Sequence, residues 1–151
     1  RLRPWEAFYR AADASGITSF APLLDCLMRL AILADIHANL FALEAVLADL
    51  GAQGADEVIL NGDLVNRGPD NAAVMARLAA AGLESTLGNH DDLMVLWARR
   101  DPSLPASWFD EPFWTSAAWA SAQLEASGWL GALARLPMTR SLALPGAPTV
   151  L

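Results

Sequence analysis

Short apolar runs alternate with amphipathic segments between residues 30 and 100. Residues 30–35 form one apolar run, which ends on Asp35, and residues 58–60 form a second. Runs of this length are typical of strands that are buried on both faces of a sheet. A third run covers residues 83–87. We therefore predict a strand at each of these three positions.

The segment between the first two predicted strands has apolar residues at helical spacing. Asn39 can accept a hydrogen bond from a free backbone amide, so we expect it to cap this helix. The apolar stripe consists of Leu40, Leu43, Leu47 and Leu50. Gly51 is expected just past the end of the helix, where glycine is common.

Two more helices are predicted further along the chain. Asp70 is expected to cap the first of them, which ends at Gly82 and whose inward-facing residues are Val74, Leu78 and Ala81. The other begins near Asp91 and runs through Arg100. The resulting β-α-β-α-β succession predicts an α/β fold, a layered sheet whose neighbouring strands are joined by helical crossovers.

Residues 101–137 depart from this alternation and are rich in aromatic side chains, which are expected in helices. They include Trp108, Phe109, Phe113, Trp114, Trp119 and Trp129. Aromatic residues at such spacing indicate a packed core more often than a cofactor-stacking site. Beyond them, residues 139–144 and 149–151 are predicted to form the two strands of a hairpin.

The chain divides into a leader and one domain. Residues 1–27 have no sustained apolar period, and we interpret them as a leader, either an over-extended start or an added segment. The alternative is a helix packed on the edge of the sheet. The domain is predicted over residues 28–151, because its first strand needs nothing upstream.

Composition limits the class of protein. A hydrophobic fraction of 54% and a charged fraction of 18% are typical of an ordered globular chain, and 151 residues give room for one domain. The net charge of −7 argues against general binding to nucleic acid or to anionic membranes. A phosphate-bearing ligand would have to be held by metal ions or by particular arginines.

The remaining compositional signals concern the compartment. Cys26 is the single cysteine, which excludes an internal disulfide and fits a reducing environment. No apolar run approaches the roughly 20 residues of a membrane span, and no signal peptide pattern is present. We therefore expect a cytoplasmic protein; the oligomeric state is left open.

Three polar signatures follow the three predicted strands, and together they indicate a metal site. They are Asp35-Ile36-His37, the segment 62–68 that begins Gly62-Asp63, and Gly88-Asn89-His90-Asp91. Alternate residues of a strand point the same way, so Asp35 and His37 are expected to bind one ion. Ligands gather at the carboxyl ends of the strands in an open α/β sheet. The mixed oxygen and nitrogen donors suit Mn²⁺, Fe or Zn²⁺ better than Ca²⁺.

On these signatures the chain resembles the calcineurin-like metallophosphoesterases over residues 28–151. Residues 62–70 and 87–94 are most similar to the bacterial branch near symmetrical dinucleoside tetraphosphatases and protein phosphatases. Residues 35–47 are more similar to small bacterial phosphodiesterases of the same superfamily. The resemblance implies the N-terminal part of a four-layer metallophosphoesterase fold.

The resemblance also implies the roles of individual residues and two divalent metal ions as cofactors. Asp35 and His37 would bind the first metal, Asp63 would bridge both, and Asn89 would bind the second. His90 would protonate the leaving-group oxygen and Arg67 would hold a phosphate oxygen. The substrate would be a small phosphomonoester, phosphodiester or dinucleoside polyphosphate. Asp91 and Asp92 are interpreted as helix-start acids rather than as ligands.

Two departures from the family pattern leave the activity of this chain open. Asn66 stands where the protein-phosphatase branch has an Asp that pairs with the catalytic histidine; an amide can orient the ring but cannot stabilise an imidazolium in the same way. The chain has two histidines, both already assigned, whereas the family has two later histidine motifs. We therefore interpret the domain as lacking these C-terminal motifs.

Two hypotheses follow. The chain is either part of an enzyme that hydrolyses phosphate esters, or a non-catalytic binding module that retains part of the metal site. A haloacid-dehalogenase-type phosphatase is disfavoured, because that family needs an Asp-x-Asp after its first strand and this chain has Asp35-Ile36-His37 there.

Overall fold

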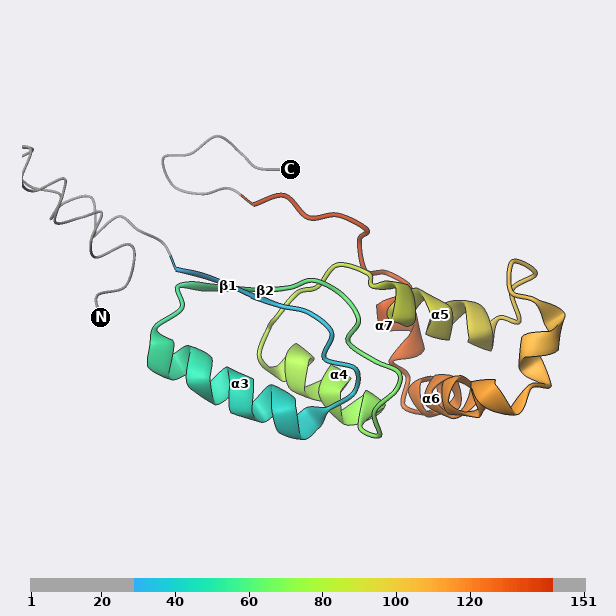
Figure 1. The fold of residues 1–151 in the computed structure, drawn as a ribbon. Helices are drawn as coiled ribbons and strands as arrows, with labels where there is room; N and C mark the ends of the chain where they lie inside the picture. Colours follow the sequence, from blue (N-terminus) through green and yellow to red (C-terminus); the bar gives the residue numbers. More distant parts are fainter. Residues whose placement is uncertain (1–28, 143–151) are drawn as a thin grey trace, which may run out of the picture.

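The structure is a computed structural model that describes residues 29–142 (Figure 1). The predicted leader, residues 1–27, lies outside the described residues, and so does most of the predicted C-terminal hairpin, residues 143–151. Both remain predictions, except that residues 139–141, the described start of the first hairpin strand, form no strand.

Two parallel strands and the helix between them form the first half of the fold. Strand β1 (Leu30–Leu33) pairs with β2 (Glu57–Leu60), with Ile32 opposite Ile59. Helix α3 (Leu40–Gln53) connects them and lies on the same side of the strands as α4 (Asn71–Ala80) (Figure 1). This arrangement confirms the predicted α/β class with helical crossovers.

The predicted third strand is reduced to one parallel bridge, between Leu60 and Ser85. The polar groups of this segment have other partners. The Ser85 Oγ accepts a hydrogen bond from the Gly62 N–H at 3.2 Å, and the Leu87 N–H donates to the Pro137 carbonyl at 2.8 Å. The segment is therefore tied to a loop and to the chain after α7, and it does not extend the ladder.

Helix α3 begins as predicted and ends later. The Asn39 Oδ1 accepts from the Ala42 N–H at 3.0 Å, which confirms the cap. The prediction that Gly51 lies past the end is wrong, since the helix continues to Gln53. Gly54, at φ 66°, takes the left-handed conformation that ends a helix, and its N–H donates to the Leu50 carbonyl.

Helix α4 begins after Asp70, whose side chain makes no capping hydrogen bond. Ala81 lies past the end of α4 and is exposed, so its predicted inward position is wrong. Helix α5 (Asn89–Ala98) begins two residues before the predicted Asp91. Its first turn therefore contains the third polar signature.

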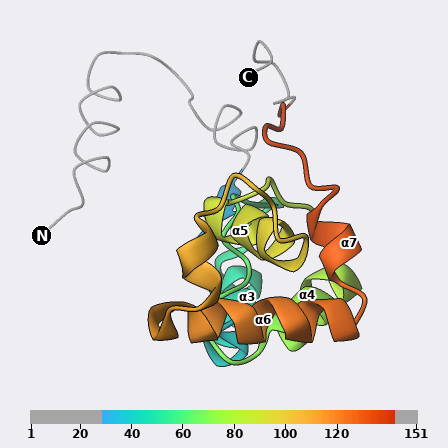
Figure 2. The ribbon, with the colours of Figure 1, turned by 90° about the vertical axis from the view of Figure 1, so that its right-hand side faces the viewer.

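The aromatic segment folds into short helices beside α5. It consists of the 3-10 turns η1 (Ala106–Phe109) and η2 (Pro112–Trp114), helix α6 (Thr115–Ala126) and helix α7 (Leu130–Leu133). Figure 2 shows α6 running below α5, and α6 contacts both α5 and α4.

The core lies between the strands and the helices and joins both halves of the fold. Its fully buried side chains include Leu60, Val65, Val74, Met94, Leu124 and Leu133. The prediction of burial on both faces is wrong for β1, because Ile32 is 63% exposed. Helices α3 and α4 cover the opposite side, and no other helix between residues 29 and 142 packs on β1. None of the helices in this part of the chain is long and apolar enough to cross a membrane.

The aromatic residues follow the core prediction only in part. Those that pack against the core are Trp108, Phe109, Trp114 and Trp129. Phe113 and Trp119 are 80% and 49% exposed, so for these two the prediction is wrong.

Candidate metal centre and active site

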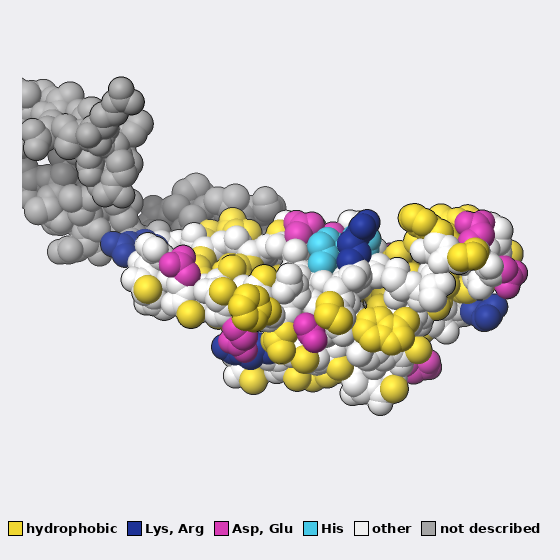
Figure 3. Space-filling model, turned by 60° about the horizontal axis from the view of Figure 1, so that its bottom comes forward, with side chains coloured by type: hydrophobic (Ala, Val, Ile, Leu, Met, Phe, Trp, Pro, Cys, Tyr) yellow, Lys and Arg dark blue, Asp and Glu magenta, His cyan; other side chains and the backbone are white. Residues whose placement is uncertain are grey.

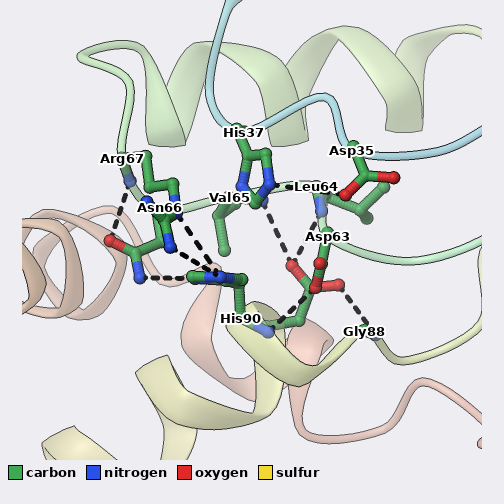
Figure 4. A network of polar contacts seen from close by, with 10 residues as sticks. Asp35, His37, Asp63, Leu64, Val65, Asn66, Arg67, Gly88 and His90 are labelled. Atoms are coloured by element: carbon green, nitrogen blue, oxygen red, sulfur yellow. Dashed lines mark hydrogen bonds and ion pairs between the residues drawn. The ribbon is translucent and has the colours of Figure 1, made fainter.

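Three loops meet at the carboxyl ends of β1 and β2 and are joined by backbone hydrogen bonds (Figure 4). The His37 N–H donates to the Asp63 carbonyl at 2.9 Å, and the Gly68 N–H donates to the His37 carbonyl at 3.0 Å. The third loop joins through His90, whose N–H donates to the Asp63 Oδ1 at 2.8 Å. The fold thus brings the three polar signatures into direct contact.

The backbone of these loops is strained. Six non-glycine residues here have positive φ angles, namely Asp35, His37, Ala38, Asp63, Asn66 and Arg67. Between residues 29 and 142, Arg100 is the only other non-glycine residue with a positive φ. Residues other than glycine rarely adopt a positive φ angle. Backbone strain of this kind is often found at functional sites.

Asp35 and His37 meet for a different reason from the predicted one. Strand β1 ends at Leu33, so the two residues lie on a left-handed turn and not on a strand. Their side chains nevertheless approach each other, with the His37 Nε2 3.5 Å from the Asp35 Oδ1.

Gly62 and Gly88 allow the second and third loops to touch through their backbones. Gly62 has φ 72°, and a Cβ on it would lie 2.6 Å from the Gly88 Cα. A Cβ on Gly88 would meet the Asp63 backbone. Only glycine fits this approach, which brings Asp63 to the start of α5.

Three side chains, one from each loop, form a cluster. Ligand atoms of His37, Asp63 and His90 all lie within 4.8 Å of one another. The two imidazole rings meet edge to face, with centroids 4.8 Å apart. Figure 3 shows histidine side chains together with acidic and basic ones at one edge of the face in view.

The other two predicted ligands lie at the rim of this cluster. The side chain of Asp35 is 69% exposed and contacts His37. Asn89 is the first residue of α5, next to His90, and is exposed. The fold therefore places three of the four predicted metal ligands on or beside the loops at the strand ends and the fourth, Asn89, in the first turn of α5.

A buried nitrogen without a hydrogen-bond partner indicates that this cluster can bind a metal ion. The His37 Nδ1 is buried and has no hydrogen-bond partner, an arrangement that costs free energy unless a ligand satisfies the nitrogen. The neighbouring donors are carboxylate oxygens and a second imidazole. Such a mixed set is typical of Zn²⁺, Fe and Mn²⁺ sites.

Asn66 orients the His90 ring. Its Oδ1 accepts from the Arg67 N–H at 2.7 Å, which turns its Nδ2 toward the His90 Nδ1 at 3.0 Å. An amide nitrogen only donates, so this contact places an N–H donor against the His90 Nδ1. The Arg67 Nε and Nη2 lie 3.4 Å from the His90 Nε2.

Burial lowers the pKa of His90 from its ordinary value of 6.5. The charges of Arg67 and His37 act in the same direction, while the Asp63 and Asp35 carboxylates act against it. The metal-free site therefore favours the neutral imidazole at neutral pH.

Asp91 has a positioning role that the sequence did not reveal. It is fully buried; its Oδ1 accepts from the Leu64 and Val65 N–H groups at 2.9 and 3.1 Å, and its Oδ2 accepts from the Gly88 N–H at 3.0 Å. Burial raises its pKa, and the three backbone hydrogen bonds oppose that rise. The bond to Gly88 fits the predicted helix-start acid, but the bonds to the second loop join segments far apart in sequence.

Asn71, at the start of α4, was also missed. Its Oδ1 accepts from the Asn66 N–H at 2.8 Å, and its Nδ2 donates to the Gly68 carbonyl at 3.3 Å. It thus fixes the loop that carries Asn66 and Arg67. The sequence signal was weak, because an Asn after Pro69-Asp70 is also a common residue of helix starts.

Comparison with known proteins assigns this chain to a family. The family model of calcineurin-like phosphoesterases matches residues 28–138, and the chain belongs to this family. The symmetrical bis(5'-nucleosyl)-tetraphosphatase of Acidovorax sp. (strain JS42) is 43% identical over 81 residues, which are 50% of this chain and 29% of that protein.

Two solved structures have a similar fold. The metallophosphoesterase from Sphaerobacter thermophilus has a TM-score of 0.55 at 33% identity, covering 77% of this chain and 43% of that chain. A hypothetical protein from Pyrococcus horikoshii OT3 has a TM-score of 0.57 at 17% identity, covering 77% of this chain and 50% of that chain. This chain thus spans half or less of the length of these relatives.

Proposed function

We propose that this chain belongs to an enzyme that catalyses metal-dependent hydrolysis of phosphate esters at a dinuclear centre. The observation that supports it best is the convergence of His37, Asp63 and His90 from three strained loops, with Arg67 beside them. Family membership supports phosphoesterase chemistry, and the tetraphosphatase relative supports a small phosphorylated substrate. The single cysteine supports a reducing compartment, which we take to be the cytoplasm.

The metal ligands in this proposal are Asp35, His37, Asp63 and Asn89. Divalent ions such as Mn²⁺, Fe or Zn²⁺, when bound, would polarise a phosphate oxygen and activate a water. The Asp63 Oδ1 accepts a hydrogen bond from the His90 N–H, which holds the carboxylate close to both histidines.

The catalytic groups are His90 and Arg67. Arg67 carries a planar fork of N–H donors and holds a phosphate oxygen. His90 gives a proton to the leaving-group oxygen, so it must be protonated when the ester bond breaks. Asn66 keeps the ring in place, but it cannot stabilise the imidazolium as a carboxylate would.

The alternative is a non-catalytic module that binds metal or phosphate. It is favoured by the count of histidines, since the chain has two and both lie in the one cluster. If His90 serves as a third ligand, the same geometry leaves no imidazole free to act as an acid.

The test combines Mn²⁺ binding by calorimetry with hydrolysis of an aryl phosphate and an aryl phosphodiester. We expect Asp63→Asn to abolish hydrolysis and to weaken Mn²⁺ binding. The matched control Asp110→Asn, at an exposed position remote from the loops, should change neither. Mn²⁺ binding without hydrolysis would favour the binding module, and a folded chain that binds no Mn²⁺ would contradict the proposed metal-dependent hydrolysis.

A further inference from the structure

A cavity of about 670 Å³ opens directly beside the proposed catalytic groups. One end is polar and is lined by Asn66, Arg67 and His90. The other end is aromatic and is lined by Trp108, Phe113 and Trp114. A single ligand in this cavity would therefore touch the phosphate-binding arginine and the aromatic rings together.

Helix α5 sets the distance between the two ends. Asn89, Leu93 and Leu96 line the cavity, and residues at this spacing share one face of a helix. From Asn89 to Leu96 the helix rises about 10 Å. The cavity thus has the length for a ligand whose phosphate and ring are separated by a spacer such as a sugar.

The aromatic rings of this cavity pack on one another. Trp108 and Trp114 are stacked, with ring centroids 3.9 Å apart and planes 21° from parallel. Trp114 also packs on Trp97, which is buried in the core. Leu104, Ser116 and Ala117 also line the cavity, and Asp92 on α5 adds one carboxylate to its lining.

Phe113 packs against the stacked Trp108–Trp114 pair, and its ring is accessible to a ligand. Its ring meets Trp114 edge-on at 5.2 Å, and the residue is 80% exposed. Rings held in this way offer stacking surface for a planar group, with little loss of side-chain entropy on binding.

We propose that this cavity binds the planar ring of a phosphate ester, so that the substrate class is a phosphate carrying a nucleobase or a similar aromatic group. Phe113 and the Trp108–Trp114 pair select the ring, while Arg67 holds the phosphate. This inference rests on the proposed phosphoesterase function.

The test measures binding to the full chain in the presence of Mn²⁺ by calorimetry, with three probes. These are adenosine 5'-monophosphate, ribose 5-phosphate, which lacks the ring, and adenosine, which lacks the phosphate. Since stacking of one base contributes about fivefold or more to affinity, the monophosphate should bind at least about fivefold more tightly than ribose 5-phosphate.

Two substitutions locate the effect. Phe113→Ala should remove most of this preference and leave the affinity for ribose 5-phosphate unchanged, and Phe113→Tyr should retain the preference. Phe41→Ala is the matched control, because Phe41 is an 88% exposed ring on α3, outside the cavity lining. Circular dichroism would verify that each variant is folded.

The outcomes separate this inference from the proposed function. Equal affinities for the two phosphates, or equal losses in Phe113→Ala and Phe41→Ala, would overturn the ring site and leave the phosphoesterase proposal intact. If neither phosphate binds but adenosine does, with the same dependence on Phe113, the ring site stands and the proposed function fails.

Discussion

The three loops of the metal centre and the aromatic segment between Trp108 and Trp129 are held in different ways. In the loops, strained backbone is fixed by buried polar groups, above all Asp91 with its three backbone donors. In the aromatic segment, apolar side chains pack on α5 with ordinary helical backbone. Hydrogen bonds stabilise the loops, whereas burial of apolar surface stabilises the aromatic segment.

This difference determines how each region responds to change. A hydrogen-bonded loop loses stability abruptly when one buried partner is removed, because the remaining groups are left unpaired in the interior. A packed helix loses stability in proportion to the apolar surface that is removed. We therefore expect the largest effects at the loops, although they contain few apolar contacts.

Asp91→Ala should have the largest effect on stability. It leaves the N–H groups of Leu64, Val65 and Gly88 without their acceptor, so the free energy of unfolding should fall by about 3 kcal/mol or more. Urea unfolding would measure this. Asp92→Asn, at the next position, should change stability by less than about 0.5 kcal/mol, and a similar small effect for Asp91→Ala would contradict the role given to Asp91.

Gly62→Ala should rank second. Its Cβ would lie 2.6 Å from the Gly88 Cα at a φ of 72°, so we expect a loss of about 2 kcal/mol. Gly82→Ala is the matched control, because Gly82 has φ 66° but no atom within 4 Å of the added Cβ. Thermal unfolding would measure both losses. If they are equal, the positive φ angle alone explains the loss at Gly62, and the close approach to Gly88 contributes nothing.

His90 should titrate below 6.5 in the metal-free protein, because burial lowers its pKa. Between the folded and unfolded pKa values the unfolded chain binds more protons. The stability from this group is therefore present above 6.5 and lost as the pH falls through the folded value. The ring resonances in an NMR titration would give the midpoint.

Asn66→Asp provides the contrast for that titration. A carboxylate 3.0 Å from the His90 Nδ1 would favour the imidazolium, so the midpoint should rise relative to the parent chain. A midpoint that does not move would mean that Asn66 does not control the charge of the ring.

The smallest effect is expected at Gly51→Ala, which should stabilise the protein by about 0.5–1 kcal/mol. Gly51 lies inside α3, where the added Cβ would meet no atom within 4 Å. Thermal unfolding would detect the gain. A loss would contradict the expectation that helix propensity determines the effect at this position.

The candidate site was predictable because its chemistry is concentrated in short signatures. Asp35, His37, Asp63 and His90 follow apolar runs directly, and parallel strands bring such positions to one edge. The left-handed turn at Asp35 and His37 was not predictable from the strand pattern, because it depends on hydrogen bonds with Asp63 and Leu64 of the second loop.

The sequence by itself determined the succession of strands and helices, the Asn39 cap and the position of the polar signatures, because these depend on local periodicity and on side-chain type. Only the tertiary structure decided that residues 83–87 make a single bridge, that Asp91 joins two loops, and that Phe113 faces a cavity and not the core. Each of these depends on which distant segments meet, and a local pattern contains no information on such contacts.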